Sequence, residues 1–383
     1  MMPTTTINGD RVRQAREIRR ISQSKLAGAI DVDQSYLSYV EAGLREPSPE
    51  VLERIALATQ FPPAFFRHPS APEFPLGSLL FRRRDSLPAD ERDQLRQAAR
   101  LAYEIFDSMA TRFKAIDIRV PRLTGEFPRE AADVARSAMG LSPDTPVTNL
   151  INRLERNGVF VLLLPLTLQR ADGFSVWADT EPRRPVIVLT GGWPGDRQRF
   201  SVAHELGHLV LHQVPTGSPS EMDSQADAFA SEFLLPSEAL RQDLNGKTIT
   251  LTLLAQLKSK WGVSMQALAR QAQNLGVITE GQRKYLDKQM GLRGWIREEP
   301  VRLEPEKPRM FRKMAESTYG IPTDGARVAA LASAPVKLVD EILDSHASRA
   351  ELTRPPKLET IDESTPPAKR KNVLQFKPKR IRA

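Results

Sequence analysis

The hydrophobic residues of the first 66 positions recur at helical spacing in short segments. Residues 9–66 therefore predict a string of short helices. A segment containing proline and glycine follows at 71–77, and we expect it to be a linker. Apolar positions at helical spacing return over 88–116 and again over 131–157, which predicts further helices.

The pattern changes after the Asn157-Gly158 pair, a natural helix end. Short β-rich runs bounded by turn residues predict three strands, at 159–165, 173–178 and 185–190. Helical spacing then resumes in three segments, at 199–212, 224–235 and 248–292. We therefore expect an α+β fold that is mostly helical and contains one small sheet.

These patterns divide the chain into consecutive parts. We expect an N-terminal all-α domain at 1–70, the linker at 71–77, a second domain with the sheet at 78–245, a C-terminal helical region with a helix-turn-helix rhythm at 246–325, and a basic tail at 350–383. The tail is rich in proline and charge and has almost no apolar pattern, which is typical of disorder.

Composition narrows the classes of protein. The net charge of +8 favours a polyanionic partner such as nucleic acid. The chain has no cysteine, which excludes disulfides, thiol catalysis and cysteine ligands to zinc. The N-terminus lacks the apolar segment of a signal peptide, and the longest apolar run is far shorter than the ~20 residues of a membrane helix. We therefore expect a cytoplasmic protein without a membrane partner.

The sequence HELGH at 204–208 carries the clearest chemistry. Residues four apart share one face of a helix, so His204 and His208 can bind one zinc ion. Glu205 lies beside them and can act as the general base for an attacking water. His212 is four residues further on, and we expect it to be an ordinary helix residue without a role at the metal.

Catalytic zinc usually has three protein ligands, so the third must come from another element. In the next predicted helix Asp223 and Asp227 share a face, and the small Ala226 between them permits close packing against a neighbour. We expect Asp223 to be the third ligand and Asp227 to orient a ligand histidine. Glu221 remains open as an alternative third ligand.

HELGH, the preceding DRQRFSVA and the following QADAFASEFLLP resemble the ImmA/IrrE family of zinc metallopeptidases. The resemblance implies a gluzincin-like peptidase domain with bound Zn²⁺ and cleavage of a repressor or other regulatory protein. The third ligand of that family is usually glutamate, so Asp223 is shorter by one methylene. We also expect the strand at 185–190 to lie at the sheet edge and to hold the substrate backbone.

The segment SQSKLAGAIDVDQSYLSYVEAG, at 22–43, has the logic of a helix-turn-helix motif. Leu26 and Leu37 point inward, whereas polar residues of the second helix point outward, and glutamine and serine suit the edges of bases. Residues 9–66 resemble the XRE (Cro/C1-type) family of DNA-binding domains. The resemblance implies DNA contacts by Gln23, Gln34, Ser35 and Ser38. The first helix carries five arginines that can contact phosphates, among them Arg16.

Together these features predict a DNA-binding transcriptional regulator that carries a zinc-dependent endopeptidase domain. Its expected partners are double-stranded operator DNA and a protein substrate, with a homodimer left open. The alternative is a non-proteolytic XRE-type transcription factor whose metallopeptidase-like domain is a sensor or interaction module. Glu205 favours the peptidase, because a structural zinc does not need a general base.

Overall fold

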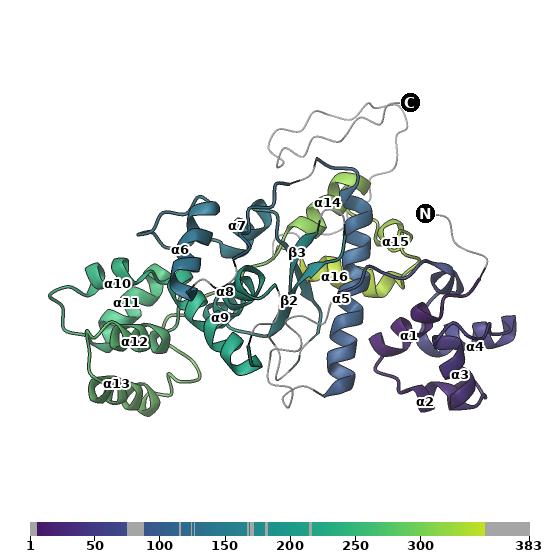
Figure 1. The fold of residues 1–383 in the computed structure, drawn as a ribbon, viewed down its shortest axis with the longest axis horizontal. Helices are drawn as coiled ribbons and strands as arrows, with labels where there is room; N and C mark the ends of the chain where they lie inside the picture. Colours follow the sequence, from purple (N-terminus) through teal and green to yellow (C-terminus); the bar gives the residue numbers. More distant parts are fainter. Residues whose placement is uncertain are drawn as a thin grey trace. The chain divides into compact units, whose positions relative to one another are not determined.

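The computed structural model describes residues 6–74 and 88–348, apart from positions 115, 124, 126, 167, 169–171, 181–182 and 214–216. Within these residues the chain forms sixteen α-helices and one three-stranded sheet (Figure 1). The expected class, a mostly helical α+β protein with a small sheet, is confirmed. The expected tail at 350–383 and the end of the expected linker, 75–77, lie outside the described residues.

The chain divides into two compact units. Unit 1 comprises residues 1–72, 89–116 and 309–383, and unit 2 comprises residues 73–88 and 117–308. These units differ from the boundaries expected from the sequence, because the helix after the expected linker joins the N-terminal segment. Compact units are not the same as domains, so the domain boundaries expected from the sequence stay a prediction.

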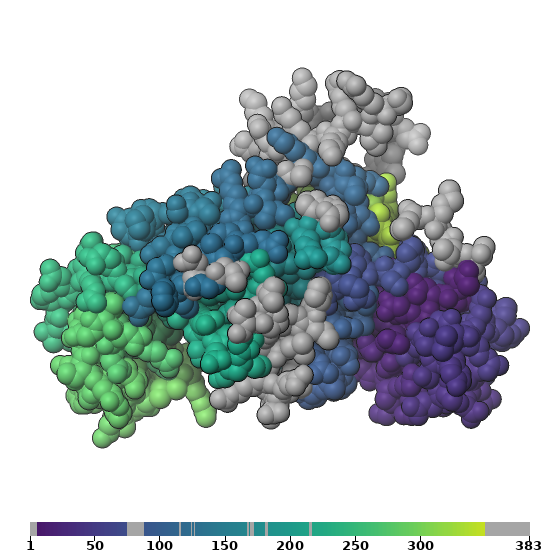
Figure 2. Space-filling model, viewed as in Figure 1, coloured from purple at the N-terminus to yellow at the C-terminus, as the bar shows by residue number. Residues whose placement is uncertain are grey.

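The regular elements among the described residues of unit 1 are all helices. Its elements are α1 (Gly9–Ile18), α2 (Gln23–Ala29), α3 (Gln34–Glu41), α4 (Pro49–Thr59), the 3₁₀ helix η1 (Pro63–Arg67), α5 (Ala89–Ala110), α14 (Met310–Tyr319), α15 (Gly325–Ala329) and α16 (Val336–Ser345). The hydroxyls of Ser22 and Ser48 accept backbone N–H groups at the starts of α2 and α4, which caps both helices. On the face drawn in Figure 2, the side chains of the N-terminal helices (purple) lie together in one continuous region.

Charged side chains join α1 to α5 inside unit 1. Arg11 is fully buried, and its guanidinium donates to both carboxylate oxygens of Glu104, at 2.8 and 2.5 Å. Arg100 is 1% exposed and donates to Asp10 at 3.2 Å. Removing one partner of such a pair leaves an uncompensated buried charge, so these pairs fix where α5 lies against α1.

The sheet of unit 2 contains β1 (Phe160–Leu164), β2 (Gly173–Ala178) and β3 (Arg184–Thr190). The three predicted strands are therefore confirmed. Their order is β1-β3-β2, with β3 parallel to β1 and antiparallel to β2. The expectation that residues 185–190 form an edge strand is wrong, because β3 pairs on both sides. Its backbone groups are used by β1 and β2, which are the outer strands of the described sheet.

The remaining elements of unit 2 are α6 (Pro128–Ala138), α7 (Leu150–Arg156), α8 (Gly195–Leu211), α9 (Pro219–Leu234), α10 (Ser237–Leu244), α11 (Leu251–Trp261), α12 (Met265–Asn274) and α13 (Glu280–Leu292). No helix of the described residues is both long and apolar enough to cross a membrane.

Helices α8 and α9 pack closely where Gly207 faces Ala226. A Cβ atom at position 207 would lie 3.2 Å from the Cα atom of Ala226 and 3.0 Å from the ring of Phe229. Ala226 and Phe229 are fully buried. Ala226, which was expected to permit close packing, therefore does so opposite Gly207, and this approach brings the polar residues of α8 and α9 together.

Candidate functional site

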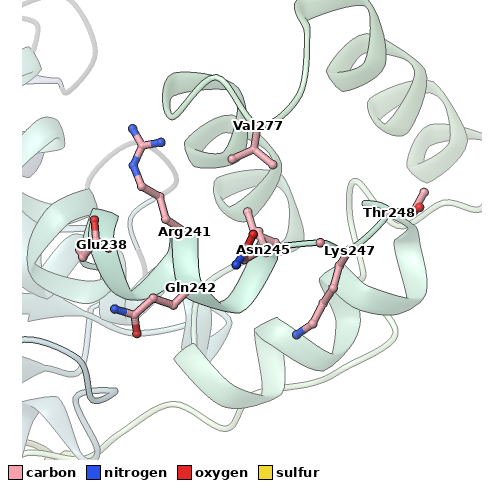
Figure 3. Close-up of a pocket in the computed structure, with 9 residues that line it drawn as sticks. Glu238, Arg241, Gln242, Asn245, Lys247, Thr248 and Val277 are labelled. Carbon is pink, nitrogen blue, oxygen red and sulfur yellow. The ribbon is translucent and has the colours of Figure 1, made fainter.

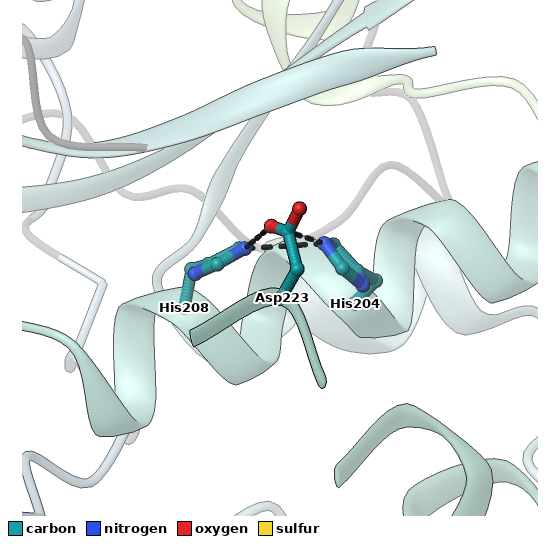
Figure 4. Close-up of side chains that lie close together, drawn as sticks. All are labelled: His204, His208 and Asp223. Atoms are coloured by element: carbon teal, nitrogen blue, oxygen red, sulfur yellow. Dashed lines mark hydrogen bonds and ion pairs between the residues drawn. The ribbon is translucent and has the colours of Figure 1, made fainter. Parts of the chain in front are cut away.

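Three side chains from α8 and α9 converge on one point (Figure 4). The Nε2 atoms of His204 and His208 lie 3.1 Å apart on α8. Oδ1 of Asp223, on α9, lies 3.6 Å from Nε2 of His208 and 4.0 Å from Nε2 of His204. The structure thus brings together the three residues that the sequence proposed as zinc ligands.

The donor set fits a zinc ion. Oδ1 of Asp223 is buried and has no hydrogen-bond partner among the described residues, although buried polar atoms normally have one. Zinc bonds of 2.0–2.1 Å at tetrahedral angles place two nitrogen ligands roughly 3.3 Å apart. The two Nε2 atoms are separated by 3.1 Å, which is close to that value. A zinc ion held by His204, His208 and Asp223 would satisfy the orphaned oxygen.

The alternative ligand Glu221 lies elsewhere. It is exposed at the start of α9, where its Oε2 accepts the backbone N–H of Ser218 at 2.8 Å. Its own N–H donates to the Ser218 hydroxyl at 3.3 Å. This reciprocal capping box lowers the pKa of the Glu221 carboxyl through its hydrogen bonds to Ser218. The structure therefore gives Glu221 a role at the helix start.

Each histidine of the pair has a partner at Nδ1. Nδ1 of His204 lies 2.8 Å from Oδ1 of Asp227, where the sequence expected an orienting carboxylate. Nδ1 of His208 lies 2.9 Å from Nδ1 of His212, and Nε2 of His212 lies 2.8 Å from Oε1 of Gln225. Burial lowers the pKa of His212 and favours its neutral form.

The sequence interpretation missed the contacts of His212 and Gln225. The spacing of four residues from His208 to His212 carried a signal, because both residues share a face of the helix. Gln225 carried none. It lies on a different helix, and only the packing of α9 against the end of α8 brings its amide to His212.

Glu205 is 1% exposed and is contacted from the sheet. The hydroxyl of Ser175, on β2, lies 2.9 Å from Oε2 of Glu205 and 2.9 Å from its backbone carbonyl oxygen. Ser175 was also missed, although a single hydroxyl between the apolar Phe174 and Val176 is a usable signal. The strand thus supplies a hydrogen-bond donor for the carboxylate expected to act as the base.

A hollow of about 610 Å³ lies away from this cluster, at the end of α10 and in the loop that follows (Figure 3). Its lining includes Glu238, Arg241 and Lys247. Arg241 and Lys247 point in different directions, and Arg241 donates to the carbonyl oxygen of Leu275 at 3.1 Å. The two cations do not converge on one point, and no residue of the histidine cluster lines this hollow.

Helices α2 and α3 form the expected helix-turn-helix arrangement in unit 1. Leu26, Leu37 and Val40 are buried between the helices. The expected DNA contacts of α3 are all exposed: Gln34, Ser35 and Ser38. The amide of Gln34 donates to Gln23 at 3.3 Å, and Gln23 in turn donates to Glu41 at 3.2 Å. The polar face of α3 is therefore available to a ligand while Gln23 and Gln34 are held together.

The expected phosphate contact Arg16 is engaged within the fold. Its guanidinium donates to both carboxylate oxygens of Glu41, at 2.6 and 2.9 Å, and to the carbonyl oxygen of Ile21 at 3.1 Å. Glu41 is 4% exposed. Arg11 is likewise bound to Glu104, and Arg20 donates to Asp90 at 2.5 Å. These contacts favour a structural role for Arg16, and its phosphate role stays an untested prediction.

Comparison with known proteins assigns both segments. Residues 154–273 match the Peptidase_M78 family model, described as the IrrE N-terminal-like domain. Residues 12–66 match the HTH_3 model, described as a helix-turn-helix. A search of curated proteins found no match to the chain.

One segment of the chain thus matches a helix-turn-helix family and another matches the IrrE/ImmA-type peptidase family, so the resemblance stated from the sequence is confirmed. The helix-turn-helix match covers α2 and α3. The Peptidase_M78 match includes β1 to β3 and the two helices of the histidine cluster, α8 and α9. A helix-turn-helix segment and a peptidase-like segment are thus joined in one chain.

Proposed function

We propose that this protein is a DNA-binding transcriptional regulator whose zinc-dependent endopeptidase domain cleaves a repressor or other regulatory protein. One observation supports the peptidase assignment above all. The buried Oδ1 of Asp223, which has no hydrogen-bond partner in the described part of the chain, faces the Nε2 atoms of His204 and His208, and Glu205 is next to His204 in sequence. The substrate class comes from the resemblance to the ImmA/IrrE family.

In this proposal His204, His208 and Asp223 hold the zinc, which as a Lewis acid would polarise the scissile carbonyl. Glu205 accepts a proton from the attacking water and later delivers it to the leaving amine. Ser175 donates to Oε2 of Glu205 and so restricts the rotation of this carboxylate. Asp227 accepts from Nδ1 of His204 and keeps the Nε2 lone pair of that ring directed at Asp223.

The DNA-binding part of the proposal places the exposed face of α3 in the major groove of an operator. Gln34, Ser35 and Ser38 would read base edges there, with Gln23 beside them. Arg16 is engaged with Glu41, so phosphate contacts are better assigned to exposed cations of the same segment, Lys25 and Arg45. A homodimer on a two-fold operator and a cytoplasmic location complete the proposal.

The decisive experiment compares the wild type with Glu205→Gln in cells that express the genes neighbouring its own. Glutamine is nearly isosteric but cannot accept the proton, so zinc content and promoter occupancy should be unchanged. Proteolysis should fall by ~10²–10⁴, the usual contribution of a general base. A regulatory protein should then accumulate and the regulatory output should be lost.

The opposite result has a clear meaning. If Glu205→Gln regulates as the wild type does and no protein accumulates, the domain is a sensor or interaction module. The peptidase assignment would then be abandoned, while the DNA-binding assignment would stand on its own measurement of promoter occupancy.

A further inference from the structure

The two histidines that face Asp223 are held at Nδ1 in chemically different ways. His204 is paired with the carboxylate of Asp227, which lies 2.8 Å away. His208 is paired with a second imidazole, His212, at 2.9 Å, and that imidazole is paired with the amide oxygen of Gln225 at 2.8 Å. His208 and His212 are 3% and 8% exposed, so hydrogen bonds within this chain of groups replace most contacts with water.

The hydrogens along this chain have a defined direction. An amide oxygen only accepts, so Nε2 of His212 must carry the hydrogen that Gln225 receives. A neutral imidazole has one donor and one acceptor nitrogen, which makes Nδ1 of His212 an acceptor. Nδ1 of His208 is then the donor, and the lone pair of its Nε2 atom points at Asp223 and His204.

The reverse direction would have a different consequence. If the Gln225 amide presented its NH₂ group to His212, the hydrogens would shift so that Nε2 of His208 carried one. That hydrogen would point at the position where the three donors meet and would exclude a cation there. The orientation of one amide on α9 thus decides whether His208 can act as a ligand.

We propose that His212 and Gln225 are positioning residues that hold His208 in the tautomer whose Nε2 atom carries no hydrogen and can bind zinc. The inference rests on the proposed zinc site and deepens it. His204 is supported by an anion, whereas His208 is supported by two neutral groups, so the two imidazoles are unequal ligands. The two positioning residues are His212, at the end of α8, and Gln225, which is exposed on α9.

The first test measures zinc affinity of the full chain by competition with a chromophoric chelator. Gln225→Leu removes the acceptor and should weaken zinc binding by ~10–100-fold, as the loss of groups that orient metal ligands typically does. His212→Phe should do the same. Gln225→Glu keeps an acceptor oxygen and should restore affinity close to that of the wild type. His68→Phe, which replaces a histidine of unit 1, is the control and should bind zinc normally.

The second test needs no metal. In the zinc-free protein, ¹⁵N spectra of the histidine rings should show a hydrogen on Nδ1 of His208 in the wild type and in Gln225→Glu. In Gln225→Leu the ring should become a mixture of tautomers. Gln225 is exposed, so Gln225→Leu is expected to fold, and its circular dichroism spectrum should equal that of the wild type.

Unchanged zinc affinity and an unchanged His208 tautomer in Gln225→Leu would overturn this inference. Failure of the underlying site is recognised separately, because His204→Ala would then also leave zinc binding unaffected. Loss of zinc in Gln225→Glu as severe as in Gln225→Leu would likewise overturn it, since the acceptor oxygen is retained there.

Discussion

The hydroxyl of Ser175 lies 2.9 Å from the carboxylate of Glu205, and the two residues belong to a strand and a helix that are adjacent in unit 2. The same hydroxyl lies 2.9 Å from the backbone carbonyl oxygen of Glu205. Strand β2 therefore controls the orientation of the carboxylate expected to act as the base. The effect of this contact on the rate of hydrolysis can be measured separately from the effect of the metal ligands on zinc binding.

Substituting Ser175 by alanine should slow peptide hydrolysis and leave zinc binding intact. A hydrogen bond to a charged group contributes about 1.5–3 kcal/mol, so we expect the rate to fall by roughly 10-fold or more. The measurement is hydrolysis of the identified substrate together with metal analysis of the same preparation. Ser175→Thr keeps the hydroxyl and serves as the control. Equal rates for Ser175→Ala and the wild type would show that this contact does not orient the base.

Alanine substitution at any of the three proposed ligands should abolish zinc binding, which is a larger effect than the weakening expected for His212→Phe. His204→Ala, His208→Ala and Asp223→Ala should each lose the ion, because each removes one of three protein ligands. Glu221→Ala is the matched control, since Glu221 caps α9 and lies outside the cluster. It should keep about one zinc per chain by metal analysis. Zinc loss in Glu221→Ala with retention in Asp223→Ala would reverse the assignment of the third ligand.

Replacing Gln34 should alter sequence preference more than overall affinity. Its amide is exposed at the start of α3 and is held beside Gln23. We expect Gln34→Ala to change the preference at one base pair by ~1–3 kcal/mol. Selection of binding sites from random DNA, followed by titration at a fixed salt concentration, measures the change. If even the wild type enriches no DNA sequence, the helix-turn-helix segment does not bind DNA with sequence specificity.

Arg16 should matter for stability. Arg16→Met leaves the carboxylate of Glu41, whose side chain is 1% exposed, without its main partner. Loss of one member of a buried pair costs about 3 kcal/mol or more, so urea unfolding should shift to lower concentrations. Arg13→Met, at a side chain that is 44% exposed, is the control. Normal stability of Arg16→Met with weaker binding to all DNA sequences would restore the phosphate role expected from the sequence.

Spacing along one helix was sufficient to predict the His204–His208 pair, although the same spacing did not reveal the role of His212. Because residues four apart share a helix face, the motif HELGH by itself places His204 and His208 side by side. The same rule identified the exposed polar face of α3. Ala226 likewise indicated a close approach of two helices, because small side chains let backbones come near one another, and the structure places Gly207 against it.

Only the tertiary structure decided between groups that look alike along the chain. Glu221 and Asp223 are acidic residues two positions apart, and packing of α9 on α8 directs one to the histidines while the other caps its own helix. Arg16 reads as a surface cation, yet the fold brings the buried Glu41 against it. Strand β3 is the central strand of the sheet, and its own residues did not reveal this because the strand order depends on which strands pair with it. Local spacing determines which side chains share a face, whereas long-range packing determines what that face meets.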